Sequence, residues 1–437
     1  IYSTFDRSQR GRSICRTDCR CRVALSRGRL LVPRSRYGCV LGEVRRETIM
    51  THCNEFADAR VNGVVTMQHT QSQILDGREL RGGGNARLEI DGVPFVNFSG
   101  CNYLALTDRP ELRSAALNVL QDGAGFSRYL VDAYGGYDPY FRAAEEEAAK
   151  FFGTEAAVYL PSGYLIGAAG FAAAEPDYDV ILLDENAHWC LVDAAKLTTK
   201  PIRYFAHRST ESLEAEIDRL APGQRPLVVT DGAFATSGTL PPLDEYADRL
   251  ATVDGRLLVD ESHSGGVVGE TGRGSVQHFG VEHIAYVGVT LSKAFCGQGA
   301  VFVGSKAEVA RAVASTPVRG SNSGSPISAS VCAAALKLVR NDPSIAKRAN
   351  DSAKYLRSNL SALGLSVPDT PAPVVSFSHG TFSEMRNIQQ RVFDEGMYVL
   401  HSNYIASGPG GIIRLSLFAD HSIEDLDRVT KAIGDAL

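Results

Sequence analysis

From about residue 156 the chain alternates short apolar runs with longer stretches of helical periodicity. The apolar runs predict buried β-strands at residues 156–160, 179–185, 226–234, 256–260, 284–292 and 299–305. Between them, residues 209–221 and 243–253 show the period of amphipathic helices. Continuous apolar strands separated by helices are typical of a mostly parallel sheet with helices on both faces. The pattern therefore predicts an α/β fold.

The residues from about 345 onward predict a smaller α+β unit. Its expected helices cover residues 345–364 and 422–437, and its expected strands cover 372–377, 397–400 and 411–418. Residues 86–106 predict a hairpin that leads into a turn. We therefore expect four parts: residues 1–49 as a leader or basic arm, 50–106 as an N-terminal segment, 107–340 as a large domain and 341–437 as a small domain.

Composition fits a large globular protein. The 437 residues are 44% hydrophobic and 22% charged, and no run of about 18 apolar residues predicts a membrane span. The nine cysteines are scattered, apart from Cys15, Cys19 and Cys21. This usage indicates reduced thiols and a cytoplasmic protein.

Charge is distributed unevenly along the chain. Residues 1–49 hold twelve arginines against four acids, so the remainder carries most of the acidic excess and does not predict a nucleic-acid-binding protein. Three interpretations of residues 1–49 are open: a non-native leader, an organellar targeting peptide, or a basic binding arm. The first methionine is Met50.

Two charged residues follow apolar strands in a way that indicates chemistry. Lys293 follows the run at 284–292, and partial desolvation there favours the neutral amine that forms Schiff bases. Asp260 follows Leu257-Leu258-Val259, and a buried carboxylate needs a cationic or hydrogen-bonded partner. A lysine with an aspartate partner for the ring nitrogen is typical of pyridoxal phosphate sites. The alternatives are a solvated lysine and a helix-capping aspartate.

Other polar residues occupy similar positions at predicted strand ends. His188 and His263 lack the spacing of zinc ligands, so we expect no metal. Ser162-Gly163-Tyr164 predicts a helix start, whose N–H groups bind phosphate, and Thr290 and Ser292 add hydroxyls. Arg414 lies in an apolar strand, where it either forms a structural ion pair or binds a substrate carboxylate.

Together these residues resemble the α-oxoamine synthase family of fold-type-I pyridoxal phosphate enzymes. The resemblance covers about Phe98 to the C-terminus. Its motifs occur in the family's order: Asn102-Tyr103-Leu104-Ala105-Leu106, Ser162-Gly163-Tyr164, His188, Asp260-Glu261-Ser262-His263, Gly272-Arg273-Gly274, Thr290-Leu291-Ser292-Lys293 and Arg414-Leu415-Ser416-Leu417.

The resemblance implies roles for these residues. Lys293 would form the internal aldimine, Asp260 would pair with the ring nitrogen, His188 would stack on the ring, and His263 would lie near the ring hydroxyl. Thr290 and the backbone of Gly163 and Tyr164 would hold the phosphate, and Ser323 would reach it from the partner of a homodimer. Ser162 and Ser292 are further expected cofactor-binding residues. Asn102 and Arg414 would address the substrate carboxylate.

Some positions depart from the family pattern. Ala235 replaces a common serine, whose bond to the ring hydroxyl is then missing or supplied by Thr236. Phe141 replaces a common histidine, and Cys296 replaces the glycine three residues after the lysine. The motifs resemble the branch that makes quorum-sensing aminoketones more than the biotin-pathway branch.

The resemblance implies a decarboxylative condensation of an amino acid, or a derivative, with an acyl-CoA thioester. The product would be an α-aminoketone used as a signal or as a precursor of lipids or secondary metabolites. Glycine, alanine, serine, 2-aminobutyrate and activated derivatives remain open as amino substrates. The alternatives are an aminotransferase, a serine palmitoyltransferase-like or 8-amino-7-oxononanoate synthase-like enzyme, and a non-catalytic domain of the same fold.

Overall fold

The computed structural model describes residues 73–128, 136–321, 323–403, 407 and 409–437, with two short strands nearer the N-terminus. The chain divides into two units, Ile1–Gln71 and Ser72–Leu437. In the first unit, β1 (Leu25–Ser26) pairs antiparallel with β2 (Arg29–Leu30). Apart from these strands, the predicted leader and its cysteines lie outside the described residues. No helix among the described residues is long and apolar enough to cross a membrane.

The second unit contains a seven-stranded sheet in the order β6-β12-β11-β10-β9-β7-β8. Its strands are β6 (Ala156–Leu160), β7 (Val180–Asp184), β8 (Ile202–Phe205), β9 (Pro226–Asp231), β10 (Arg256–Asp260), β11 (Ala285–Thr290) and β12 (Ala300–Gly304). Strand β12 runs opposite to the other six strands of this sheet, and the pairs that do not include it are parallel. The predicted mostly parallel sheet is confirmed. Strand β8 was not predicted, because three of its four residues are partly exposed and form no continuous apolar run.

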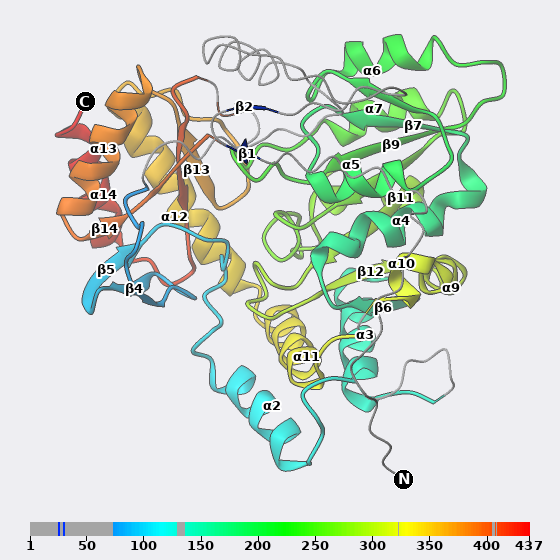
Figure 1. Cartoon of the computed structure of the whole chain (residues 1–437), viewed down its shortest axis with the longest axis horizontal. Coiled ribbons are helices and arrows are strands. Elements are labelled where there is room, and N and C mark those ends of the chain that lie inside the picture. Colours follow the sequence, from blue (N-terminus) through cyan, green and yellow to red (C-terminus); the bar gives the residue numbers. More distant parts are fainter. Residues whose placement is uncertain are drawn as a thin grey trace. The chain divides into compact units, whose positions relative to one another are not determined.

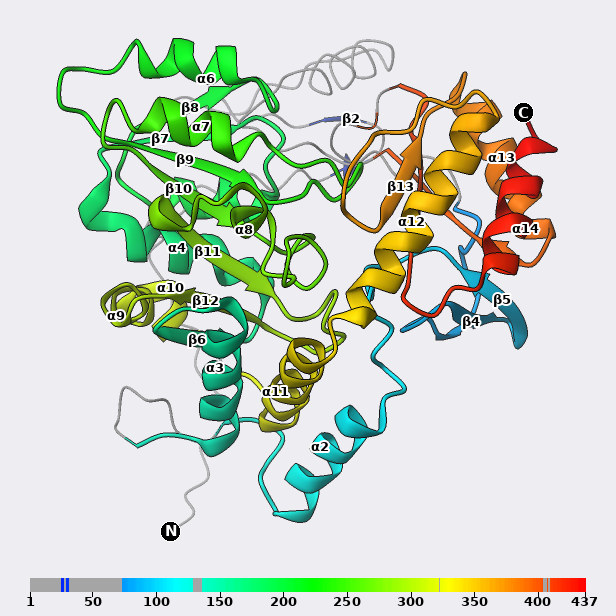
Figure 2. The same cartoon turned by 180° about the vertical axis from the view of Figure 1, so that it is seen from behind.

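Helices cover both faces of this sheet (Figures 1 and 2). Ile181 and Leu183 pack in one hydrophobic cluster with residues of α4 (Ile166–Ala174) and α5 (Trp189–Lys196). The intervening Val180 and Leu182 face a second cluster, built with α6 (Thr210–Ile217), α7 (Leu243–Leu250) and α8 (Ser275–Phe279). Both faces of the strands are buried, which explains why the strands are continuous apolar runs.

The remaining helices of this part flank the sheet or lead to the C-terminal part of the second unit. They are α2 (Pro110–Gln121), α3 (Pro139–Phe152), α9 (Lys306–Ala314), α10 (Thr316–Arg319), α11 (Pro326–Asn341) and the short 3-10 turns η2 (Gly163–Leu165), η3 (Glu175–Asp177) and η4 (Glu282–Ile284).

The C-terminal part contains two small sheets and three helices. One sheet has the order β13-β16-β15 and the other β14-β5-β4-β3. The strands are β3 (Leu80–Gly82), β4 (Arg87–Ile90), β5 (Val93–Asn97), β13 (Val374–Phe377), β14 (Met397–Tyr398), β15 (Leu400–Ser402) and β16 (Ile412–Ser416). The helices are α12 (Ser344–Ala362), α13 (Phe382–Asp394) and α14 (Ile423–Gly434). Because β5 pairs with β14, the predicted hairpin near the N-terminus completes a sheet of the C-terminal part.

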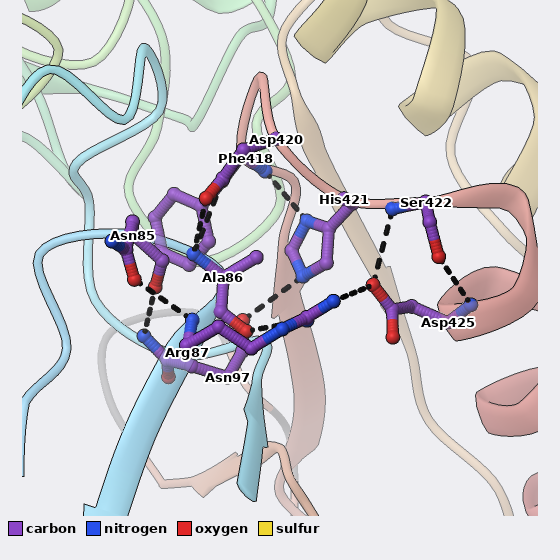
Figure 3. Close-up of polar contacts among 9 residues, drawn as sticks. All are labelled: Asn85, Ala86, Arg87, Asn97, Phe418, Asp420, His421, Ser422 and Asp425. Atoms are coloured by element: carbon purple, nitrogen blue, oxygen red, sulfur yellow. Dashed lines mark hydrogen bonds and ion pairs between the residues drawn. The ribbon is translucent and has the colours of Figure 1, made fainter.

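Polar contacts join these two distant stretches of the chain (Figure 3). Arg87 forms an ion pair with Asp425 at 2.9 Å, and the backbone N–H of Ala86 donates to Asp420. His421 contacts the carbonyl oxygen of Asn97 through Nε2 at 3.0 Å. The hairpin is thereby held against the segment that follows β16.

Candidate active site

The polar side chains of the candidate site follow neighbouring strands of the central sheet. Strand β10 ends at Asp260, whose register partner is Asp231 at the end of β9. His188 follows β7 and Lys293 follows β11. Ligands of open α/β sheets bind outside these carboxyl ends. The four residues predicted from separate segments to be catalytic, including His263 just after β10, therefore meet at one edge of the sheet.

His263 and Lys293 are in direct contact. The Nε2 atom of His263 lies 2.9 Å from Nζ of Lys293. Burial lowers the pKa of the His263 imidazole well below its usual value, and the nearby charges of Lys293 and Arg414 act in the same direction. The imidazole is therefore neutral near pH 7, with one nitrogen that donates and one that accepts.

Asp260 is the buried acid that the sequence predicted, with only 3% of its surface exposed. One carboxylate oxygen accepts the backbone N–H of Ser262 at 3.0 Å, and the other accepts the thiol of Cys190 at 3.4 Å. No lysine or arginine of the described residues forms an ion pair with it. A buried carboxylate without a cation is costly, and a protonated pyridine nitrogen would supply that cation. This observation fits pyridoxal phosphate.

His188 is the N-cap residue of helix α5 and lies near two acids. Its backbone N–H donates to Asp231 at 2.8 Å, and its Nδ1 lies 3.0 Å from the Cys190 sulfur. Burial lowers the pKa of the imidazole, although the charge of Asp260 opposes this shift. The ring lies edge-on to Tyr164, with centroids 6.4 Å apart. A neutral aromatic ring at this place suits the predicted stacking on the cofactor, which stays a prediction.

Cys190 and Asp231 were missed by the sequence analysis. Burial, with Asp260 and Asp231 nearby, raises the pKa of the Cys190 thiol strongly, so it remains a donor. Burial and Asp260 likewise raise the pKa of Asp231 well above its usual value, which favours its neutral form. Asp231 carries the same signal as Asp260, an acid at the end of an apolar run. Cys190 carries no comparable signal.

The same atoms could also hold a metal ion. Ligand atoms of His188, Cys190 and Asp260 lie within 4.8 Å of one another, and nitrogen, sulfur and oxygen ligands suit zinc. Binding a metal there would require deprotonation of the thiol and would occupy Asp260. A metal and a cofactor paired with Asp260 therefore exclude each other.

The predicted phosphate ligands Ser162, Gly163 and Tyr164 lie where the chain passes from β6 to α4. The side chain of Ser162 accepts the backbone N–H of Tyr164, and η2 begins at Gly163. A Cβ atom on Gly163 would lie only 2.9 Å from Oγ1 of Thr290. Thr290 is itself 2.8 Å from the hydroxyl of Ser292. The structure therefore brings these predicted phosphate ligands together, and the close approach of Thr290 leaves no room for a side chain at residue 163.

Within one chain, Ser323 does not lie with the other predicted phosphate ligands. It lines a separate cavity of about 290 Å³ together with Arg128, Tyr159 and Arg319. Pro161, next to Ser162 in the sequence, also lines that cavity. The predicted contact of Ser323 with the phosphate of a partner subunit stays a prediction.

Arg414 is buried within strand β16 and is fully engaged by the protein. Its Nε donates to the carbonyl oxygen of Ala235 at 2.7 Å, and Nη1 donates to the carbonyl oxygen of Gly100 and to Ser416. Nη2 donates to Tyr103 at 3.0 Å and contacts the Cys101 sulfur at 3.7 Å. The weak sulfur contact is the one that a substrate carboxylate would replace most easily.

Tyr103 is a further residue that the sequence analysis missed, although it lies in a quoted motif. Its hydroxyl is 2.8 Å from Nδ1 of His263. The neighbouring Asn102, predicted to bind substrate, contacts Cys296 through its carbonyl oxygen. The motif therefore connects Arg414 to His263 through the tyrosine, whereas the role of Asn102 stays a prediction.

The departures from the family pattern have local explanations. Cys296 has a φ of 54°, a left-handed conformation that explains why glycine is common there. Phe141 is buried and packs edge-on against Tyr159, under the guanidinium of Arg128. Ala235 contributes its carbonyl oxygen to Arg414, which requires no side chain.

A cavity of about 220 Å³ opens beside His188. Its lining includes Ala235 and Thr236 from the turn after β9, together with His207 and Arg208 from the turn after β8. The cavity therefore adjoins both the predicted ring-stacking residue and the turn that holds Arg414.

Comparison with known proteins agrees with this geometry. Residues 95–433 match the family model described as aminotransferase class I and II. The 8-amino-7-oxononanoate synthase of Methylococcus capsulatus is 32% identical over 369 residues, which cover 81% of this chain and 92% of that protein. The enzyme of the same name from Thermosipho melanesiensis is 29% identical over 358 residues, covering 80% and 90%.

Solved structures show the same fold. The serine palmitoyltransferase of Sphingomonas wittichii superposes with a TM-score of 0.77 at 23% identity, covering 90% of this chain and 96% of that one. The 8-amino-7-oxononanoate synthase of Francisella tularensis gives a TM-score of 0.65 at 23% identity. The predicted fold class, a mostly parallel α/β sheet of fold type I, is confirmed.

Proposed function

The chain belongs to the aminotransferase class I and II family as an α-oxoamine synthase, and from this premise we propose that it condenses an amino acid with an acyl-CoA thioester. Carbon dioxide and free coenzyme A would leave, and an α-aminoketone would be the product. The cofactor is pyridoxal phosphate, which supplies an electron sink for the carbanion at the amino acid's α-carbon.

The observation that carries the proposal is the position of Asp260 beside the Lys293–His263 pair. Asp260 is a buried carboxylate that forms no ion pair with a lysine or arginine of the described residues, and the charges of Asp260 and Lys293 both act on His188 and on Cys190. A lysine and an acid at one strand edge are what a pyridoxal phosphate site requires. The close approach of Gly163 and Thr290 supports our placing the phosphate there, which we call the phosphate cradle.

Each residue then has a distinct task. Asp260 would keep the ring nitrogen protonated, and His188 would cover one face of the ring. Lys293, once released from the cofactor, would remove the α-proton as a general base. His263, neutral and in contact with Lys293, would donate a hydrogen bond to the acyl carbonyl oxygen as it gains negative charge.

Arg414 would orient the carboxylate that finally leaves. Its guanidinium is held by Ala235 and Tyr103, so its position does not depend on the substrate. Fixed donors of this kind reduce the entropy lost when a substrate is oriented. Asn102, next to Tyr103 in the same turn, is our second candidate for this carboxylate.

The finer identity of the substrates is a separate part of the proposal. The names of the relatives support an 8-amino-7-oxononanoate synthase-like or serine palmitoyltransferase-like activity more than the quorum-sensing branch that the motifs resemble. Glycine, alanine, serine and 2-aminobutyrate are the amino substrates to test first. A homodimer with Ser323 reaching the partner's phosphate, in the cytoplasm, completes the proposal.

The deciding experiment is a screen for thiol release. Purified enzyme is mixed with pairs of amino acids and acyl-CoAs, free thiol is recorded, and products are identified by mass spectrometry. We expect release of thiol and a product lacking the carboxylate. If no pair releases thiol while a 2-oxo acid is aminated, the enzyme is an aminotransferase instead.

Lys293→Ala is the matching variant, with the exposed Lys354→Ala as its control. We expect Lys293→Ala to lose activity and the visible absorbance of the bound cofactor, and Lys354→Ala to keep both. A wild-type protein that contains no cofactor and gains none on reconstitution would instead support a non-catalytic domain.

A further inference from the structure

Four side chains from four segments form a continuous line of contacts through the site. Arg414 Nη2 lies 3.0 Å from the Tyr103 hydroxyl, and that hydroxyl lies 2.8 Å from Nδ1 of His263. Nε2 of His263 lies 2.9 Å from Nζ of Lys293. Tyr103, His263 and Arg414 are all buried, so water does not compete for these contacts.

The directions of the two hydrogen bonds at the Tyr103 hydroxyl can be assigned from the arginine end. Arginine only donates, so the Tyr103 oxygen must accept from Arg414. Burial raises the pKa of Tyr103 far above its usual value, so its hydroxyl proton is retained. With Arg414 on one side of the oxygen, the strong acceptor within reach of that proton is Nδ1 of His263.

The opposite assignment is less favourable. If Nδ1 carried the proton, both His263 and Arg414 would donate to the same tyrosine oxygen. The hydroxyl proton would then be left with the Cys101 thiol, and sulfur is a weak acceptor. A neutral imidazole nitrogen is the better partner, so the arrangement favours a free Nδ1 lone pair and a proton on Nε2. That proton can be donated to Lys293 when the lysine amine is neutral, as its role as general base requires, whereas an ammonium at Lys293 would donate to Nε2 and favour the other tautomer.

We propose that Tyr103 is a positioning residue that fixes the proton of neutral His263 on Nε2, the nitrogen that faces the reacting centre. In this tautomer His263 donates a hydrogen bond to the acyl carbonyl oxygen as it becomes negative. In the other tautomer Nε2 would present a lone pair and repel that oxygen. The proposal rests on the proposed function, because it assigns how His263 acts in the acyl-transfer step.

The tautomer can be observed directly, without activity. In protein labelled with ¹⁵N-histidine, the two ring nitrogens of His263 give different shifts according to which one bears the proton, and His263→Gln identifies the signals. We expect wild type to show protonated Nε2 and Tyr103→Phe to show a mixture of tautomers. Tyr246→Phe is the control, because the Tyr246 hydroxyl is buried without a hydrogen-bond partner among the described residues.

The kinetic test separates the two chemical steps. Exchange of the α-proton with solvent deuterium, measured without acyl-CoA, reports Lys293 as base, whereas thiol release reports acyl transfer. We expect Tyr103→Phe to lower thiol release about 10-fold or more, as part of the roughly 10²–10³-fold that one oxyanion donor supplies. At saturating amino acid, the rate of proton exchange should change less than about threefold, and a rise in the KM for the amino acid would report only the lost bond between Tyr103 and Arg414.

A double-mutant cycle tests the link between the two residues. The glutamine amide in His263→Gln places an N–H near the position of Nε2 and has no tautomers. In that background, adding Tyr103→Phe should therefore cost little further thiol release. Independent, multiplicative losses in the cycle would overturn the proposal.

The outcome does not depend on whether Tyr103→Phe folds. A spectrum of the cofactor-bound wild type with the proton on Nδ1 would by itself refute the assignment. Failure of the proposed function would appear differently, as absence of thiol release from wild type whatever the tautomer.

Discussion

The thiol of Cys190 donates to the carboxylate of Asp260 at 3.4 Å, and the same sulfur lies 3.0 Å from Nδ1 of His188. One buried side chain thus links the acid predicted to pair with the ring nitrogen and the imidazole predicted to stack on the ring. Because the thiol pKa is raised by burial and by both nearby acids, the sulfur remains a hydrogen-bond donor.

Removal of this link should weaken cofactor binding. A net hydrogen bond contributes about 1 kcal/mol, so we expect Cys190→Ala to raise the Kd for pyridoxal phosphate about fivefold. Cys190→Ser keeps a donor and should stay near wild type. Absorbance titration of cofactor-depleted protein measures the Kd of each variant. Equal Kd values for wild type and Cys190→Ala would show that the thiol does not support cofactor binding.

Asp260→Asn should keep the fold and lose most activity. An amide cannot hold the ring nitrogen protonated, so the electron sink is weakened, and we expect a loss of kcat of about 10²-fold or more. Asp231→Asn is the matched control. Its neutral carboxyl resembles an amide, and an amide oxygen can still accept the N–H of His188, so kcat should change little. Similar losses in both variants would mean that Asp260 acts through the fold.

Gly163→Ala tests the phosphate cradle. The added methyl group would lie 2.9 Å from Oγ1 and 3.2 Å from Cβ of Thr290, so either the turn or the threonine must move. We expect the Kd for pyridoxal phosphate to rise about 10-fold or more, with little change in the unfolding midpoint of the cofactor-free protein. Ala168→Gly is the control, because it changes the nearby helix α4 without adding an atom to the cradle. Gly223→Ala would not serve, because Gly223 has a φ of 79° and an alanine there would strain the backbone.

The possible metal site at His188, Cys190 and Asp260 gives a separate prediction. If His188, Cys190 and Asp260 serve the cofactor, prolonged dialysis against EDTA should leave kcat unchanged, and elemental analysis of active protein should find less than about 0.1 metal ion per chain. Loss of activity that zinc restores would show instead that the three ligands hold a metal.

Much of this site was visible in the sequence, because the acids, histidines and lysine each end an apolar run. Parallel strands bring such residues to one edge whatever lies between them, so Asp260, His188 and Lys293 could be predicted to meet. Cys190 could not, because its contact depends on how α5 turns after His188. Tyr103 was hidden for another reason: its partners Arg414 and His263 lie in distant segments, and no local pattern shows that contact.

The fold, too, could be predicted from the sequence only in part. The strands of the central sheet were predictable because both faces are buried. The parallel pairing of β5 with β14 was not, since it joins the two ends of the described chain and is set by tertiary packing. Strand β8 was missed because its side chains are partly exposed at the sheet's edge.

The contact between these two ends gives a pH-dependent prediction. His421 is 9% exposed and lies between Phe98 and Phe418, with ring centroids 4.4 Å and 5.4 Å away. Its Nδ1 accepts the backbone N–H of Phe418, and its Nε2 donates to the carbonyl oxygen of Asn97 (Figure 3). Burial lowers its pKa from 6.5 to about 4, and Asp425 only partly opposes this.

Stability should therefore fall in acid. Between pH 6.5 and 4 the unfolded chain binds a proton at this histidine that the folded chain does not. The free energy of unfolding is therefore unaffected by the titration of His421 above pH 6.5. As the pH falls towards 4 it decreases, by about 3 kcal/mol in total. His421→Gln keeps a donor and an acceptor but does not titrate. In urea unfolding at pH 7.5 and 4.5, wild type should lose about 2 kcal/mol more than this variant, while other groups that titrate, such as Asp420, affect both proteins alike. Equal losses would mean that His421 is protonated in the folded state without cost.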